Sequence, residues 1–137
     1  MIDIASYAIM DKHYHVVLRI DENAAQVLSD KAVVSHWHKL FKGTALTKEF
    51  GQKTIAEPEK PVLFNILKQW WARLCSISWF MRCINEPLAR MANQEDNCTG
   101  RFWERRFKSQ ALLDEKSLLA CMTYVELNSI QARAGNK

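Results

Sequence analysis

The stretch from Tyr7 to Ile20 alternates with a two-residue period, and this pattern constrains the fold more than any other feature of the chain. Side chains two apart on a strand point to the same face of a sheet. One face of the predicted strand carries His13, His15, Val17 and Arg19. The other face carries an apolar stripe suited to packing under a helix, formed by Tyr14, Val16, Leu18 and Ile20. Residues 2–20 are therefore predicted to form a β-hairpin. Its first strand runs from Ile2 to Met10, its turn lies near Asp11 and Lys12, and its second strand runs from His13 to Ile20.

Two imidazoles on one face of a strand are the arrangement that a divalent metal needs from a sheet, because neutral imidazole is the commonest nitrogen ligand. The alternative is that His13 and His15 are two unrelated surface histidines. A second such pair, His36-Trp37-His38, lies where apolar residues recur at helical spacing, and positions two apart on a helix point about 200° apart. Trp37 is therefore predicted to be core, and its two neighbours to be ordinary flanking residues.

Size and composition indicate one globular domain with a real core. The chain has 137 residues, of which 48% are hydrophobic and 25% are charged. No apolar run approaches the roughly 20 residues of a membrane span, and the N-terminus lacks a signal-peptide pattern. The four cysteines form no Cys-x-x-Cys pair, which is typical of thiols in a reducing cytoplasm.

A mild excess of positive charge is concentrated in one short segment. The net charge is +4, and the segment from Arg101 to Lys108 holds four basic residues against one acid, Glu104. These basic residues are Arg101, Arg105, Arg106 and Lys108, with Phe102, Trp103 and Phe107 between them. Basic side chains mixed with aromatic rings suit a phosphate backbone with unstacked bases, as in sites for single-stranded nucleic acid. The alternative is a solvated strand edge whose aromatic rings face the core.

The segment between the hairpin and residue 60 predicts two helices and a loop. Asp21 is expected to cap a short helix through Leu28, and Ser29 a second helix that ends near Phe41. Residues 42–60 contain glycines, lysines and a proline without a clear period, so we expect an exposed loop there.

Three further elements are expected after this loop. Pro61 fits the first turn of a helix whose apolar stripe is Val62, Ile66, Trp70 and Leu74. The next helix has a core stripe of Ile77, Phe80, Met81, Ile84, Leu88 and Met91, and Pro87 should kink or split it near Asn85. Residues 101–112 are predicted to form a strand. Asp114 should then cap a last helix to about Ala132, with Leu118, Met122 and Val125 as its buried stripe.

On the last predicted helix, Tyr124 and Asn128 are four residues apart and therefore share one face. A tyrosine one turn before an amide is unremarkable alone. The strand with His13 and His15, the segment from Gly100 to Gln110 and this helix nevertheless occur in one order at one spacing. In that combination, residues 2–134 resemble the single-tyrosine HUH transposases, and most closely the REP-associated tyrosine transposases.

The resemblance implies a fold, an activity and a set of site residues. The implied fold is α+β, a ferredoxin-like HUH domain with an antiparallel sheet and helices packed on one face. His13 and His15 match the metal-holding histidine pair, and Asn128 matches the polar residue that completes the site for Mg²⁺ or Mn²⁺. Tyr124 matches the nucleophile that cleaves single-stranded DNA and forms a 5′-phosphotyrosine. A phenol with an ordinary pKa near 10 is a poor nucleophile at neutral pH unless the phosphate is polarised by a metal.

Three departures from the family pattern shape the expectation. The strand and helix that usually precede this segment are absent before Met1, which predicts a single domain, residues 1–137, that is a fragment with an open sheet edge. Such an edge should cause aggregation or pairing into a homodimer. Lys12 replaces the usual asparagine before the first histidine, where it would repel a metal or contact phosphate. The usual Asn-Pro pair after the catalytic helix is Asn128-Ser129.

The sequence therefore predicts a cytoplasmic DNA transposase that acts on single-stranded or hairpin DNA and binds no membrane. Its DNA-binding residues are expected to be Lys12, Arg101, Trp103, Arg105, Arg106 and Lys108. Two alternatives remain: a transposase remnant that binds DNA hairpins without cleaving them, and an α/β module that binds RNA or a protein.

Overall fold

The computed structural model describes residues 1–10 and 12–134, and the chain divides into two compact units. One unit comprises residues 2–20 and the chain from Phe107 onward, and the other comprises Met1 with residues 21–106. The protein is α+β, with a two-stranded antiparallel sheet and helices. Within the described ranges, no helix combines the length and apolarity that crossing a membrane requires.

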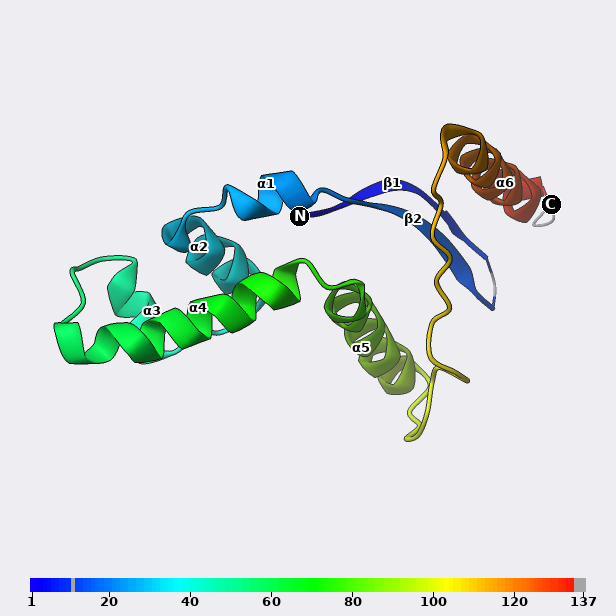
Figure 1. Ribbon diagram of the computed structural model, residues 1–137. Coiled ribbons are helices and arrows are strands. Elements are labelled where there is room, and N and C mark those ends of the chain that lie inside the picture. The colour runs from blue at the N-terminus through cyan, green and yellow to red at the C-terminus, as the bar shows by residue number, and fades with distance from the viewer. Residues whose placement is uncertain (11, 135–137) are drawn as a thin grey trace. The chain divides into compact units, whose positions relative to one another are not determined.

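The predicted β-hairpin is confirmed (Figure 1). Strand β1 (Ile2–Ile9) pairs with β2 (Tyr14–Ile20) in a register that sets Ala8 opposite His15 and Ser6 opposite Val17. A register shift between Ile4 and Ser6 marks a β-bulge. The backbone N–H of Met10 donates to the carbonyl of His13 at 2.9 Å and helps to close the turn. Asp11, which was predicted to lie in this turn, falls outside the described residues.

The helix of the hairpin unit is α6 (Glu115–Ala134), and Asp114 caps it as predicted. The backbone N–H of Ser117 donates to the Asp114 carboxylate at 2.8 Å, and the Ser117 hydroxyl donates to its other oxygen. Both hydrogen bonds favour the charged carboxylate and hold the pKa of Asp114 below its usual range. The hydrogen bond from the Ser117 backbone has the larger effect on this pKa. The cap therefore fixes where α6 begins.

The face of the hairpin that receives α6 is the opposite of the predicted one. Ala8, Val17 and Val125 form the buried core of this unit, so the helix packs on the face that also carries His15. The cause is steric, because alanine and valine let a helix approach closely, whereas the other face presents large side chains. Tyr7 and Ile9 on that other face are 63% and 71% exposed. Leu118, predicted to be buried on α6, is instead 37% exposed.

The second unit is helical. Its elements are α1 (Glu22–Gln26), α2 (Asp30–Leu40), α3 (Ala45–Phe50), the 3-10 turn η1 (Glu57–Glu59), α4 (Lys60–Leu74) and α5 (Ile77–Glu95). Both predicted N-caps are confirmed: Asp21 accepts from the backbone N–H of Ala24 at 2.8 Å, and Ser29 from that of Ala32 at 3.3 Å. Pro61 lies in the first turn of α4, as expected.

Tryptophan stacking organises the core of the helical unit. The rings of Trp37 on α2 and Trp70 on α4 stack in parallel with centroids 4.7 Å apart, and Trp79 on α5 packs against Trp37. The prediction of Trp37 as core is thus confirmed. The stripe predicted for α4 was partly wrong, because Leu63, Leu67 and Trp70 are buried whereas Val62 is exposed.

The segment 42–60 is not the loop that was predicted. It contains α3 and η1, and Thr44 caps α3 by accepting from the backbone N–H of Thr47. The Thr47 side chain is fully buried, and its hydroxyl lies 3.2 Å from His38 Nε2. His38 is therefore a structural residue that joins α2 to α3, which corrects its interpretation as an ordinary flanking residue. Helix α3 has six residues, which is too short for a helical period of apolar residues to be recognised in the sequence.

Helix α5 is assigned without a break through Pro87, so the predicted split near Asn85 does not occur. Only Met81 of its predicted stripe is buried, and Leu88 and Met91 are 42% and 63% exposed. The predicted strand over residues 101–112 is also wrong, since the structure assigns no strand there. Side chains of this segment bond to α5 instead: the Trp103 indole N–H donates to the Asn85 carbonyl at 2.9 Å. Gly100, with φ of +136°, begins the segment after the helix.

Candidate active site

Three of the predicted site residues lie together in the hairpin unit. The imidazole rings of His13 and His15 meet edge to face with centroids 5.3 Å apart. The ring of Tyr124, on α6, lies 5.9 Å from that of His15, with the planes inclined by 65°. Two segments separated by about a hundred residues of sequence thus bring two imidazoles and a phenol into one small region.

The local sequence explains this approach. His15 is on β2 opposite Ala8, whose methyl side chain is completely buried. A small residue at this position lets α6 lie close to the strand pair. On α6, Val125 is buried against the hairpin, and its neighbour Tyr124 stands at the margin of the contact with 57% of its surface exposed. The phenol is therefore held beside His15 and is open to solvent.

His13 differs from His15 in its setting. It lies directly before β2, where its carbonyl accepts the hydrogen bond from Met10, and its side chain is exposed. His15 is half-buried beside α6. The His15 ring thus lies within the packing of the unit, whereas at His13 it is the backbone that the turn fixes.

Asn128 carries an unusual polar atom. Its side-chain Nδ2 is buried and has no hydrogen-bond partner among the described residues. Burying an amide group without a partner costs about 1–3 kcal/mol, so each such group calls for a physical reason. An amide oxygen and nitrogen have nearly the same shape, and a half-turn of the side chain would put a metal-ligating oxygen at this position.

Imidazole nitrogens and an amide oxygen are donor types that divalent cations accept. In the described part of the chain no three His, Cys, Asp or Glu side chains gather into a group that could hold a metal. His13, His15 and Asn128 would instead offer two nitrogens and one amide oxygen. Imidazole nitrogen and carbonyl oxygen together suit Mn²⁺ better than Mg²⁺, since nitrogen ligands follow the Irving–Williams order.

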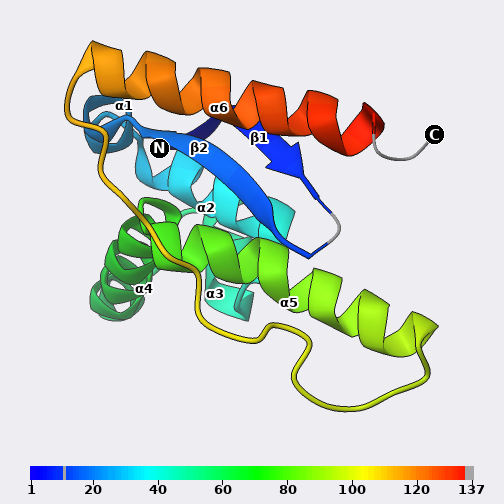
Figure 2. The same ribbon diagram turned by 90° about the vertical axis from the view of Figure 1, so that its right-hand side faces the viewer.

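The predicted DNA-binding residues are divided between the two units. Lys12 and Lys108 are exposed residues of the hairpin unit, whereas Arg101, Trp103, Arg105 and Arg106 belong to the helical unit. In the helical unit the segment runs beside α5 (Figure 2), and the Arg106 guanidinium donates to the Ser78 hydroxyl at 3.1 Å. Trp103 is anchored through its indole N–H, so it is not free to stack on a base.

Sequence reasoning named Phe102 among the aromatic residues of this segment but did not count it as a DNA-binding residue, and it missed the setting of Trp79 on α5. Phe102 is 45% exposed and packs edge to face on Trp103, so its ring is the more accessible of the two. Trp79 has the guanidinium of Arg73 over its ring at 4.4 Å and that of Arg82 at 5.0 Å. The contact between Arg82 and Trp79 could have been predicted from the sequence, because residues three apart on a helix are neighbours on one face.

Comparison with protein-family models, with curated proteins and with solved structures gave no match to this chain.

Proposed function

We propose that this protein is a transposase of the single-tyrosine HUH type, which cleaves and rejoins single-stranded DNA through Tyr124. The observation that supports it most is the contact of the His15 and Tyr124 rings, with His13 beside them. We also assign the hairpin and α6 to a ferredoxin-like HUH domain. The proposal is motivated by the sequence resemblance, and the proximity of the His13, His15 and Tyr124 rings supports it.

The reaction is an exchange of phosphodiesters. The Tyr124 Oη attacks the phosphorus, the bond from phosphorus to the 3′ oxygen breaks, and the DNA 5′ to the cut leaves with a free 3′-hydroxyl. The phenol loses its proton to solvent, and the departing 3′ oxygen takes one up. One ester replaces another, so the step is reversible, and a 3′-hydroxyl of another strand can attack the phosphotyrosine to join the DNA.

The residues of this chain have distinct roles in that step. When bound, a divalent cation would polarise the scissile phosphate and stabilise the charge of the transition state. His13, His15 and Asn128 would hold it. Packing of Val125 orients α6 and with it the phenol, and this prior placement reduces the entropy that the attack would otherwise cost. The exposure of Tyr124 admits a strand that no enclosed pocket would accept.

Exposed cations would hold the DNA backbone. Arg101, Arg105 and Lys108 are exposed, and Phe102 offers a ring for stacking. Their contribution should be non-specific and sensitive to salt, because each lysine or arginine on a phosphate releases a counterion. Lys12, which is exposed beside His13, would contact phosphate next to the cut.

The test is a covalent-adduct gel with a pool of oligonucleotides, each a hairpin followed by a randomised single strand. With Mn²⁺, a label at the DNA 3′ end should migrate with the denatured protein, whereas a 5′ label should not, because the attacking tyrosine keeps the 3′ part. Tyr124→Phe should abolish the adduct. Tyr7→Phe, which changes an exposed phenol on the opposite face of the hairpin, should leave it intact.

Binding of the pool without any adduct in the wild type would instead favour a DNA-binding remnant. Absence of both binding and adduct would leave the protein- or RNA-binding module as the remaining alternative. An adduct that persists in Tyr124→Phe would overturn the assignment of the nucleophile.

A further inference from the structure

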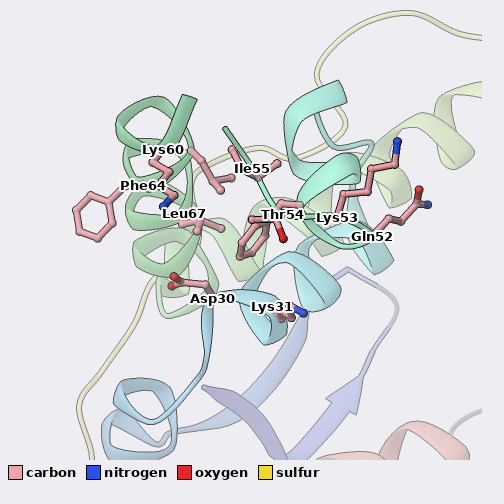
Figure 3. A pocket seen from close by; sticks show the side chains of 11 residues that line it. Asp30, Lys31, Gln52, Lys53, Thr54, Ile55, Lys60, Phe64 and Leu67 are labelled. Atoms are coloured by element: carbon pink, nitrogen blue, oxygen red, sulfur yellow. The ribbon is translucent and has the colours of Figure 1, made fainter. Parts of the chain in front are cut away.

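The helical unit has a hollow of about 580 Å³ between the start of α2, the residues that follow α3, and α4 (Figure 3). This volume lies within the range of about 300–1,000 Å³ that is usual for ligand pockets. Ile55, Leu63 and Leu67 form its floor and are each at most 7% exposed. The floor is thus a dry apolar surface that a flat ring could cover.

The rim of the hollow is polar and carries a net positive charge. Lys31, Lys53 and Lys60 come from three different segments, and Asp30 is the acid of the lining. Lys60 forms an ion pair with Glu57. Lys31 and Lys53 form no ion pair within residues 1–10 and 12–134, so their charges are available to a ligand. Figure 3 shows Lys53 and Gln52 on the side opposite α4, with Asp30 and Lys31 below.

Two aromatic rings and two neutral polar groups complete the lining. They are Phe50, Phe64, Gln52 and Thr54. Phe64 is 64% exposed, and its ring points outward at the edge of the hollow (Figure 3). Stacking on such a ring contributes about 1–3 kcal/mol per base in sites for single strands. The amide and hydroxyl supply hydrogen-bonding groups for the edge of a base.

We propose that this hollow is a nucleotide subsite, which seats one unstacked base of a single DNA strand while Lys31 and Lys53 contact the flanking phosphates. The placement of the cations favours a strand over a compact anion, because Lys31 belongs to α2 and Lys53 to the segment after α3. A fatty acid is the competing ligand for an apolar hollow. It would need a closed tunnel with one cation at its end, whereas three lysines line this hollow. The proposal rests on the proposed function, since it makes the helical unit hold the DNA that the hairpin unit cleaves.

The test measures binding apart from cleavage, in the full chain with Tyr124→Phe and without divalent metal. Fluorescence anisotropy with labelled oligothymidylate should show about tenfold weaker binding for the double variant Lys31→Gln/Lys53→Gln, and its salt slope should fall by about 1.4, or 0.7 for each phosphate contact. The control Lys48→Gln/Lys68→Gln removes the same charge from α3 and α4 outside the hollow. All four lysines are exposed, so the melting temperatures should agree.

A photocrosslink locates the base. Oligothymidylate that contains one 5-iodouracil should crosslink to Phe50 or Phe64, and the double variant should lose this crosslink while the control retains it. Equal affinity losses in both double variants, a crosslink at other aromatic residues, or tight binding of palmitate without binding of the oligonucleotide would each overturn the proposal.

The same reagents distinguish failure of this proposal from failure of the proposed function. An adduct at Tyr124 in the wild type without a crosslink in the hollow would reject the subsite alone. A crosslink in the hollow without any adduct would reject the cleavage reaction and retain the subsite.

Discussion

The imidazole of His15 on β2 and the phenol of Tyr124 on α6 lie with their ring centroids 5.9 Å apart. The contact exists because α6 packs on the small side chains of the hairpin, Ala8 and Val17, and not on the large apolar stripe of the opposite face. Side-chain size therefore decides which face becomes the candidate active site.

Metal binding should depend on the strand histidines and not on the helical pair. Mn²⁺ should raise the melting temperature of the wild type, because a ligand that binds only the native state stabilises it by about 2.7 kcal/mol at a hundred times its Kd. His13→Ala should remove this gain. His36→Ala should retain it although its hydrogen bond to the Ala32 carbonyl is lost. Differential scanning fluorimetry with and without Mn²⁺ checks this, and equal loss in both variants would contradict the strand site.

Asn128→Leu should separate the stability of the metal-free protein from its affinity for metal. Leucine keeps a similar shape and removes the buried Nδ2 that lacks a partner, so the metal-free protein should be about 1 kcal/mol more stable to urea. The same variant should bind Mn²⁺ more weakly than the wild type. A loss of stability without metal would mean that the amide is satisfied in the native protein.

Arg105 and Trp103 should affect DNA binding in different ways. Arg105→Ala removes an exposed cation, so the affinity for oligothymidylate should fall and the salt slope should decrease by about 0.7. Trp103→Phe removes the hydrogen bond to the Asn85 carbonyl. It should lower thermal stability by about 1 kcal/mol and leave the salt slope unchanged. Anisotropy titrations over a series of salt concentrations, paired with melting curves, measure both effects.

Gly43→Ala should destabilise the helical unit. A Cβ at this position would lie 2.0 Å from His38 Nε2 and 2.7 Å from the Thr47 hydroxyl. His38 cannot move freely, since it bonds to Thr47 and packs edge to face on Trp70. Overpacking of this kind costs about 1–3 kcal/mol. Gly51→Ala is the control, because its Cβ would lie 3.4 Å from the Lys48 carbonyl oxygen and 4.0 Å from that of Thr47, which are ordinary contact distances. Urea unfolding of both variants should show the loss in Gly43→Ala alone.

The cap of α6 should make its attachment sensitive to acid. The pKa of Asp114 is lowered in the folded protein, so its carboxylate stabilises the native state at pH above its unfolded value of 3.8. This contribution is lost as the pH falls from about 4 through the folded pKa. Asp114→Asn keeps a capping side chain without charge and should flatten the dependence of melting temperature on pH over that interval. A parallel acid transition in both proteins would show that another carboxyl group is responsible.

Local sequence signals determined much of the secondary structure. The alternation over residues 7–20, the capping residues Ser29 and Asp114, and Pro61 in a first turn act through neighbours in the chain, so the hairpin and the starts of α2, α4 and α6 could be predicted. Aromatic residues in the segment 101–112 suggested a strand, but a strand forms only beside a partner. There the side chains of Trp103 and Arg106 bond instead to Asn85 and Ser78, both on α5.

The sequence by itself determined which residues are chemically able to form the candidate site, namely His13 and His15 at the start of the second strand and the tyrosine one turn before Asn128. Only the tertiary structure decided that α6 covers the histidine face, that Trp103 is an anchor, and that His38 joins α2 to the buried Thr47. Periodicity specifies the faces of an element, whereas the partner of each face depends on the shape and volume of side chains far away in the chain.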